Sequence, residues 1–221
     1  MLKLEKICYR YKNGDRDVLN NISATFESGK FTSIVGSSGS GKTTLLSIMA
    51  GLDKPTSGEV TIDGDSLGFI DLDSYRRERI SMIFQAFHLF PLLTAIENVC
   101  YPMEVIGISK AVTRDETKRR AKALLESVGI DIEKYNRYPA NLSGGEQQRV
   151  AIARALSSGA KVILADEPTG NLDKANGDSV VDILRVLARE KGYAVIVVTH
   201  NPEIAAASDV VYRMTDGVLT L

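Results

Sequence analysis

The sequence of 221 residues lacks an excess of charge of either sign, because 27 Lys and Arg residues stand against 28 Asp and Glu residues. A general nucleic-acid binder carries a basic excess, and an acidic disordered tail carries the opposite one, so neither class is indicated. Long apolar runs are missing too, since a run such as 194–198 is far too short to cross a bilayer. We therefore expect no nucleic-acid partner and no membrane span.

Cysteine is scarce as well. Cys8 and Cys100 are the two cysteines, and their spacing fits no metal site. Residues 1–6 form no apolar core of a secretory signal. These features favour a cytosolic protein with two structural thiols.

The apolar pattern predicts an α/β fold within a single domain, 1–221. The first sixty residues alternate as short strands with turn signals, which favours an antiparallel β-subdomain. Residues 87–158 are expected to form a helical subdomain, with helices over 114–128 and 146–157. Apolar strands then flank a helix over 178–190, which predicts a mostly parallel sheet buried on both faces.

A glycine-rich loop follows the strand predicted over 31–35 and precedes a predicted helix that ends near Gly51. Its residues, Gly36-Ser37-Ser38-Gly39-Ser40-Gly41-Lys42-Thr43, match the phosphate-loop pattern G-x-x-x-x-G-K-[ST]. Glycines let several backbone N–H groups point inward, and the helix N-terminus adds its positive dipole end. In this pattern Lys42 reaches the β- and γ-phosphates, and the Thr43 hydroxyl ligates Mg²⁺. An ordinary Gly/Ser loop is the alternative, and the flanking strand and helix disfavour it.

Two carboxylates end the apolar strand 162–165. A phosphate-loop enzyme needs one carboxylate on the metal side and one group that orients the attacking water. We expect Asp166 to serve the metal and Glu167, which is turned differently, to act as general base. Two solvated acids at the start of a loop are the alternative.

The segment Leu142-Ser143-Gly144-Gly145-Glu146-Gln147-Gln148-Arg149 resembles the L-S-G-G-x-Q signature of ABC-transporter ATPase subunits. The phosphate loop, the signature and the Asp-Glu pair follow one another in that family's order, and the resemblance covers essentially the whole chain. It implies a Mg-dependent ATPase whose hydrolysis of ATP drives transport.

Further residues resemble other motifs of that family. Tyr11 resembles the aromatic that stacks on adenine, with Tyr9 as its competitor. Gln85 resembles the glutamine that senses Mg²⁺ and water, His200 the switch histidine at the γ-phosphate, and 169–173 the loop that crosses the dimer interface. The resemblance implies catalytic roles for Glu167, His200, Gln85 and Lys42, and metal contacts from Thr43, Gln85 and Asp166. It implies ATP contacts from Tyr11, Gly36, Ser37, Ser38, Gly39, Ser40, Gly41, Lys42, Thr43, Thr44, Gln85, Ser143, Gly144, Gly145, Asp173 and His200.

The signature also begins a predicted helix, whose N-terminus is a second anion site. In the family, two subunits pack head to tail, and each ATP lies between one phosphate loop and the partner's signature, so a homodimer is expected. The apolar segment 86–93 resembles the groove that receives a coupling helix of a membrane permease. The resemblance thus implies a cytoplasmic subunit, peripheral on the inner face of the cell membrane.

The branch of the family is indicated by 51–58 and 165–173. They resemble the branch of macrolide efflux, lipoprotein release, antimicrobial-peptide resistance and the cell-division pair, which favours an exporter or a mechanotransmission system. The ATPase of a binding-protein-dependent importer shares every motif and stays open. A non-transport ABC ATPase of translation or DNA repair would have tandem cassettes or an insertion, and a kinase or GTPase would lack the signature.

Overall fold

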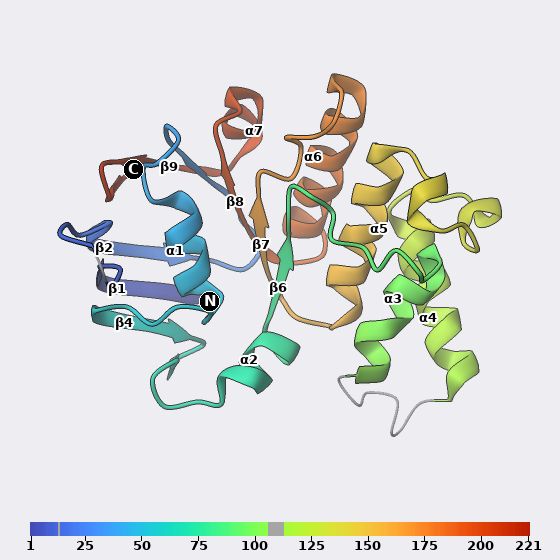
Figure 1. Cartoon of the computed structure of the whole chain (residues 1–221), viewed down its shortest axis with the longest axis horizontal. Helices are drawn as coiled ribbons and strands as arrows, with labels where there is room; N and C mark the ends of the chain where they lie inside the picture. The colour runs from blue at the N-terminus through green and yellow to red at the C-terminus, as the bar shows by residue number, and fades with distance from the viewer. Residues whose placement is uncertain (13, 106–112) are drawn as a thin grey trace. The chain divides into compact units, whose positions relative to one another are not determined.

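The computed structural model describes residues 1–12, 14–105 and 113–221 (Figure 1). The chain divides into two compact units. The core unit consists of residues 1–82, 161–167 and 184–221, and the helical unit consists of residues 83–160 and 168–183. The helical subdomain that we predict over 87–158 falls within the helical unit, apart from residues 106–112, which lie outside the described residues.

An antiparallel sheet with the strand order β2-β1-β4-β5 forms the first part of the core unit. Its strands are β1 (Leu2–Tyr9), β2 (Leu19–Phe26), β4 (Ser57–Ile62) and β5 (Asp65–Ser66). Leu2 lies opposite Phe26 and Leu4 opposite Ala24, and all four side chains are buried. The alternation of apolar residues therefore turns one face of the sheet to the core, and the predicted antiparallel subdomain is confirmed.

The second sheet of the core unit has the order β10-β9-β3-β8-β7-β6. Its strands are β3 (Phe31–Val35), β6 (Ile80–Ile83), β7 (Val162–Asp166), β8 (Ala194–Thr199), β9 (Val210–Thr215) and β10 (Val218–Thr220). β3 pairs in parallel with β8 and β9, and β8 pairs in parallel with β7. Every residue of β8 is buried, as expected for a central strand with both faces covered. The predicted mostly parallel sheet is confirmed.

Helix α1 (Lys42–Met49) joins the two sheets through one hydrophobic cluster. Leu45, Leu46 and Met49 of α1 are buried there together with Leu4 and Ile34 from the two sheets. Two shorter helices, α2 (Leu72–Glu78) and α7 (Pro202–Ala207), also belong to the core unit. Residues 36–41 connect β3 to the N-terminus of α1, and this packing fixes both ends of that loop, as a phosphate loop requires.

Helix α6 (Lys174–Arg189) begins four residues before the start that we predict at Asp178. The reason is a cap, because Asp173 accepts hydrogen bonds from both the backbone N–H and the side-chain amide of Asn176. Asp is a preferred N-cap residue, and these bonds satisfy donors of the first turn. They also hold the pKa of Asp173 below its ordinary value, the Asn176 N–H being the main cause.

The helical unit contains three helices that pack against one another, α3 (Ala95–Val105), α4 (Arg114–Ser127) and α5 (Gly144–Ser157). Short 3₁₀ turns at Ile132–Lys134 and Pro139–Asn141 lead from α4 into α5. The predicted helices over 114–128 and 146–157 are confirmed, whereas the sequence pattern missed α3. Pro102 lies inside α3, and proline is an ordinary sign of a helix end.

The N-terminus of α5 is closed by a capping box. Ser143 is the N-cap, its hydroxyl accepts from the Glu146 N–H, and the Glu146 carboxylate accepts from the Ser143 N–H at 2.8 Å. Lys134 adds an ion pair with Glu146 at 2.6 Å. The bond from Lys134 is the main cause that lowers the pKa of Glu146 below its ordinary value.

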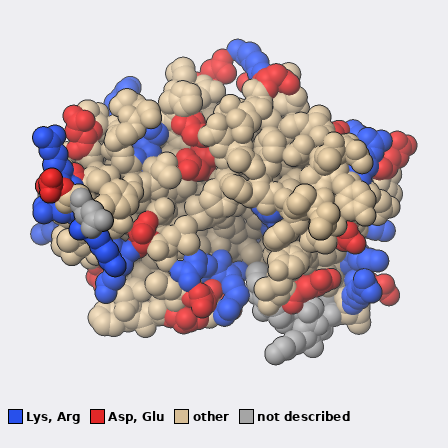
Figure 2. Space-filling view, viewed as in Figure 1, with Lys and Arg blue, Asp and Glu red and all other residues tan. Residues whose placement is uncertain are grey.

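Within the described residues, no helix has both the length and the apolar character that a membrane span requires. Figure 2 shows basic and acidic side chains next to one another around the edge of the face drawn, and few of them at its centre. This distribution agrees with the net charge of −1.

The close approach of β4 to β1 at Gly58 gives a first prediction. Gly58 has a φ of +88°, and a Cβ there would collide with the backbone oxygens of Glu5 and Lys6. Gly64 has a φ of +93° but open space around its Cβ position. We expect Gly64→Ala to cost about 1 kcal/mol of unfolding free energy through backbone strain, and Gly58→Ala to cost about 1–3 kcal/mol more through the collision. Denaturant unfolding of both variants measures this, and equal losses would contradict it.

The ion pair at the start of α5 predicts a pH effect. Because the pKa of Glu146 is lowered on folding, its stabilisation is complete above its unfolded value of 4.5 and disappears as the pH falls through the folded value. We expect Glu146→Gln to cost about 1 kcal/mol of unfolding free energy at pH 7 and less at pH 3. Urea unfolding at both pH values checks this, with the exposed position Glu27→Gln as control. A loss that does not depend on pH would contradict the assignment.

Candidate active site

The register of the parallel sheet brings three candidate segments to one edge. Val35, which precedes the glycine loop, lies opposite Thr199, and Val198 lies opposite Asp166. Because β3, β8 and β7 are neighbours and parallel, their carboxyl ends meet at the same edge. The phosphate loop, the Asp166-Glu167 pair and His200 therefore gather there, within the core unit. Ligands of open α/β sheets bind at this edge.

The glycine loop is shaped as a tight cradle. A Cβ on Gly36 would collide with the Met214 carbonyl oxygen and crowd the Ser40 hydroxyl, and Gly41 has a φ of +106°. The Lys42 ammonium donates to the carbonyl oxygens of Gly36 and Ser37, both at 2.9 Å, so it closes the loop from inside. The buried Ser40 hydroxyl has no hydrogen-bond partner among the described residues. A buried unpaired donor beside an ammonium fits an anionic ligand.

Asp166 ends β7 beside the start of α1. Its carboxylate is hydrogen-bonded to the Thr43 side chain. Burial is the main cause that raises the pKa of Asp166, the neighbouring charge of Glu167 raises it further, and Lys42 and Thr43 oppose the shift. A divalent cation would favour the ionised carboxylate, and the hydroxyl and carboxylate oxygens are the hard ligands that Mg²⁺ takes. The side chains of this pair fit a magnesium site.

Glu167, the next residue, has different hydrogen-bond partners. Its φ of +44° is unusual for a residue with a side chain, and its N–H donates to the Val198 carbonyl oxygen at 3.0 Å. One carboxylate oxygen, Oε1, lies 2.7 Å from Nδ1 of His200, and the other, Oε2, lies 2.9 Å from the hydroxyl of Thr199. The left-handed turn thus separates Asp166 and Glu167 into two different environments. This is the arrangement that one metal ligand and one general base require.

Tyr11 and Tyr9 differ in accessibility. Tyr11 is 50% exposed, whereas Tyr9 is 9% exposed and belongs to the hydrophobic cluster. The two rings meet edge to face with centroids 5.0 Å apart, and the Tyr11 hydroxyl is hydrogen-bonded to the Thr44 hydroxyl at 3.0 Å. The ring of Tyr11 is therefore held near the first turn of α1 with surface left for stacking.

Gln85 lies in the helical unit, where it is bound to the loop 169–173. Its side chain donates to Asn171 at 3.2 Å, and the Asn171 amide donates back to the Gln85 carbonyl oxygen at 3.0 Å. A Cβ on Gly170 would crowd the Gln85 side chain, so glycine permits this approach. The structure therefore joins two segments that the sequence analysis treats separately.

The signature residues Gly144 and Gly145 lie at the start of α5, beside that loop and the start of α6. A Cβ on Gly145 would collide with the Asn176 side chain, and one on Gly144 would touch Leu172. Glycine at Gly145 thus allows close packing against the first turn of α6. The capping box occupies the N–H groups of Ser143 and Glu146 at this helix start, so these two donors are not free for an anion.

Sequence reasoning missed two polar side chains of α5 that organise the helical unit. Gln148 is fully buried, and its amide donates to the Pro168 and Phe84 carbonyl oxygens at 2.8 and 3.4 Å. Arg154 donates to the carbonyl oxygens of Phe87 and His88, which both have a positive φ. These side chains hold the segments on either side of Gln85 and before the 169–173 loop. Only their hydrogen bonds in the folded chain reveal this role.

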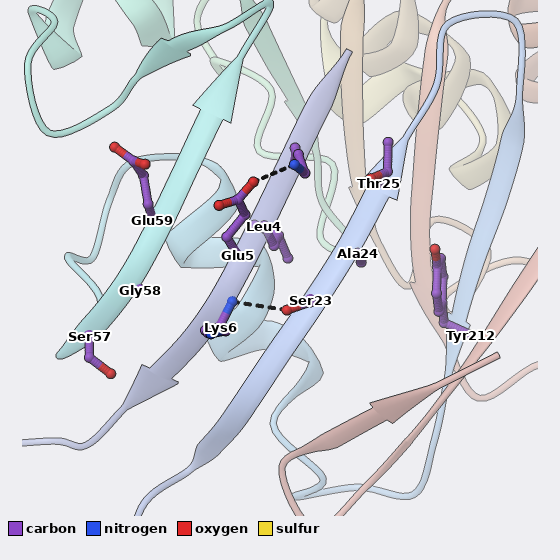
Figure 3. Close-up of a pocket in the computed structure, with 11 residues that line it drawn as sticks. Leu4, Glu5, Lys6, Ser23, Ala24, Thr25, Ser57, Gly58, Glu59 and Tyr212 are labelled. Atoms are coloured by element: carbon purple, nitrogen blue, oxygen red, sulfur yellow. Dashed lines mark hydrogen bonds and ion pairs between the residues drawn. The ribbon is translucent and has the colours of Figure 1, made fainter.

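A cavity of about 880 Å³ lies elsewhere on the core unit, over β1, β2 and β4 (Figure 3). Its lining includes Lys3, Glu5, Lys6 and Ser23. Lys3 forms an ion pair with Glu5, and the Lys6 N–H donates to the Ser23 hydroxyl at 3.0 Å. None of the residues that we predict to bind a nucleotide lines this cavity.

Comparison with known proteins identifies the family. A sequence profile of the ABC transporter family matches residues 19–170. An ABC transporter ATP-binding protein of Mycobacterium tuberculosis is 41% identical over 99% of this chain and 88% of its own length. The macrolide export ATP-binding/permease protein MacB of Shigella flexneri is 44% identical over 98% of this chain, which corresponds to 33% of MacB.

Solved structures agree with the sequence comparison. The ABC transporter ATP-binding protein MJ0796 of Methanocaldococcus jannaschii is 42% identical over 98% of this chain and 94% of its own length. Its dimeric structure in a post-hydrolysis state with ADP and Pi has a TM-score of 0.89 and covers 100% of this chain and 97% of that one. The chain belongs to the ABC transporter family, as an ATP-binding and ATP-hydrolysing subunit.

Proposed function

We propose that this subunit hydrolyses Mg·ATP at the carboxyl edge of β3, β8 and β7 to drive a membrane permease, in an export or mechanotransmission system. The carrying observation is that Glu167 and His200 are in hydrogen-bond contact at the sheet edge where Lys42 closes the glycine loop. Related proteins support the export branch, because MacB is named a macrolide export protein.

The chain's own groups account for binding. The backbone N–H groups of the loop, from Gly36 to Thr44, surround the phosphates, and the Lys42 ammonium exchanges its carbonyl partners for phosphate oxygens. Thr43 and Asp166 would hold Mg²⁺, Gln85 would be a further ligand, and Tyr11 would stack on the adenine. Bound Mg²⁺ neutralises charge on the phosphates and orients them for in-line attack.

Hydrolysis then needs a base for the attacking water. Glu167 accepts the proton of the water, and His200 orients the carboxylate and contacts the γ-phosphate. His200 is suited to reach outward, because its side chain is 74% exposed. Asp166 would not compete for this role, because the Thr43 side chain is bonded to it and a bound cation would occupy it as well.

A second copy of the chain completes the site. Ser143, Gly144, Gly145 and Asp173 of one copy contact the ATP that the other copy's loop holds, so two copies pack head to tail around two nucleotides. The dimeric structures of MJ0796 support this arrangement. Because the γ-phosphate contacts both copies, hydrolysis weakens the closed dimer.

The permease contact lies on the helical unit. Phe90 and Leu92 follow Gln85 and are exposed, Leu92 by 86%. Phe90 packs on the exposed ring of Tyr101 with centroids 4.7 Å apart, and the Arg154 guanidinium lies over Phe90. This apolar patch suits a helix of a membrane partner. MacB supports such a partner, because its name joins an ATP-binding protein and a permease. The subunit would then be peripheral on the cytoplasmic face of the membrane.

The assignment of the base predicts a trapped dimer. We expect Glu167→Gln to bind ATP with unchanged affinity, to lose at least about 10²-fold in turnover and to accumulate as a dimer in Mg·ATP, because proton acceptance fails after closure. Lys42→Ala is the matched control, and should lose ATP binding and remain monomeric. Light scattering and a phosphate-release assay measure this. A monomeric Glu167→Gln with wild-type turnover would overturn the proposal.

The permease patch predicts a separable defect. We expect Phe90→Asp to abolish co-purification with the permease from native membranes, since a charge would be buried at the contact, while ATP affinity stays within about twofold. Ile132→Asp, at an exposed apolar position on the 3₁₀ turn after α4, serves as control and should keep the partner. If Phe90→Asp retains the permease, this surface is not the contact.

A further inference from the structure

Thr199 is the last residue of β8 and is fully buried, with 0% of its surface exposed. Its hydroxyl lies 2.9 Å from Oε2 of Glu167 and 3.0 Å from the backbone nitrogen of Asn201. No motif in the sequence analysis assigns a role to this residue. Thr199 thus links Glu167, the proposed base, to the turn that contains His200.

The direction of these two hydrogen bonds is determined by chemistry. A backbone N–H can only donate, so the Thr199 oxygen accepts from Asn201. An ionised carboxylate can only accept, so the Thr199 hydroxyl proton is directed at Oε2 of Glu167. The Asn201 N–H therefore orients the Thr199 hydroxyl as a donor to Glu167.

The two partners of Glu167 differ in freedom. His200, on Oε1, has a side chain that is 74% exposed and can turn toward a nucleotide. Thr199, on Oε2, is buried, and its β-branched side chain has few rotamers in a strand. Strand β8, which ends at Thr199, also holds the Glu167 backbone, because the Val198 carbonyl oxygen accepts a hydrogen bond from the Glu167 N–H. The bond from Thr199 is thus the fixed one of the two.

The turn after Thr199 is anchored on both sides. Asn201 caps α7, with its side-chain oxygen accepting from the Glu203 N–H at 2.8 Å, and Pro202 occupies the first helical position. His200 therefore stands between Thr199, which is held in the sheet, and Asn201, which is held by the helix. The same Thr199 hydroxyl takes part in holding the turn and in orienting the carboxylate.

We propose that Thr199 is a positioning residue for ATP hydrolysis, which holds Oε2 of Glu167 so that Oε1 is presented to His200 and the attacking water. This inference rests on the proposed function, because it needs Glu167 to be the base. A hydrogen bond that orients the base affects the chemical step, whereas the phosphate loop binds ATP independently of it.

The test compares Thr199→Val, which keeps the shape and removes the hydroxyl, with Thr199→Ser, which keeps the hydroxyl. We expect Thr199→Val to lower kcat by about ten- to a hundredfold, as for loss of one hydrogen bond to a charged group, with the Kd for ATP within about twofold. Thr199→Ser should restore most of the rate. Thr215→Val, an exposed threonine at the end of β9, is the matched control and should keep the wild-type rate.

A double-variant cycle separates positioning from structural support. With Glu167→Gln already present, Thr199→Val should lower the remaining rate by less than about twofold, because both changes act through one group. Equal losses in both backgrounds, no rescue by serine, or a wild-type rate in Thr199→Val would each overturn the inference. Should Thr199→Val fail to fold, Thr199→Cys replaces it in the double-variant cycle. Its S–H group is a weak donor, so we expect it to lower kcat as well, and again by less in the Glu167→Gln background. If Glu167→Gln keeps full turnover, the proposed function itself fails, independently of Thr199.

Discussion

The parallel pairing of β3 with β8, and of β8 with β7, is the constraint on which the active site depends. It sets Val35 opposite Thr199 and Asp166 opposite Val198, so the residues that follow each strand leave the sheet together. A shift of one residue would turn every inward side chain of a buried strand to the other face. The register of this apolar sheet therefore determines how Lys42, Glu167 and His200 are aligned.

Backbone conformation at the sheet edge completes the alignment. The phosphate loop passes so close to β9 that only glycine fits at position 36. The Lys42 ammonium donates hydrogen bonds to two main-chain carbonyl oxygens of this loop. Glu167 adopts a positive φ although it has a side chain, a conformation that costs about 1–3 kcal/mol. Its bonds with Val198, Thr199 and His200 maintain this turn.

In the helical unit, wholly or partly buried polar side chains hold irregular backbone segments in place. Asn98 is fully buried, and it accepts from the Phe90 N–H and donates to the carbonyl oxygens of Phe90, Leu93 and Thr94. Gln148 and Arg154 hold the backbone on either side of Gln85. Their hydrogen bonds to backbone carbonyl and N–H groups give irregular segments one defined course, which the apolar packing of three helices alone would not specify.

The phosphate loop and the strand-ending Asp-Glu pair can be predicted from the sequence, because each is a run of adjacent residues whose chemistry follows from local geometry. The signature is recognised by its resemblance to ABC-transporter ATPases. The apolar periods also predict both sheets apart from β5 and β6, and the helices α1, α4, α5 and α6, whereas α2, α3 and α7 were missed. The folded structure was needed to show that Thr199 contacts Glu167, that Asn171 binds Gln85, and that Gln148 holds two loops. These contacts join residues that are far apart in the chain, and their partners follow from strand register and helix packing, which no local pattern encodes.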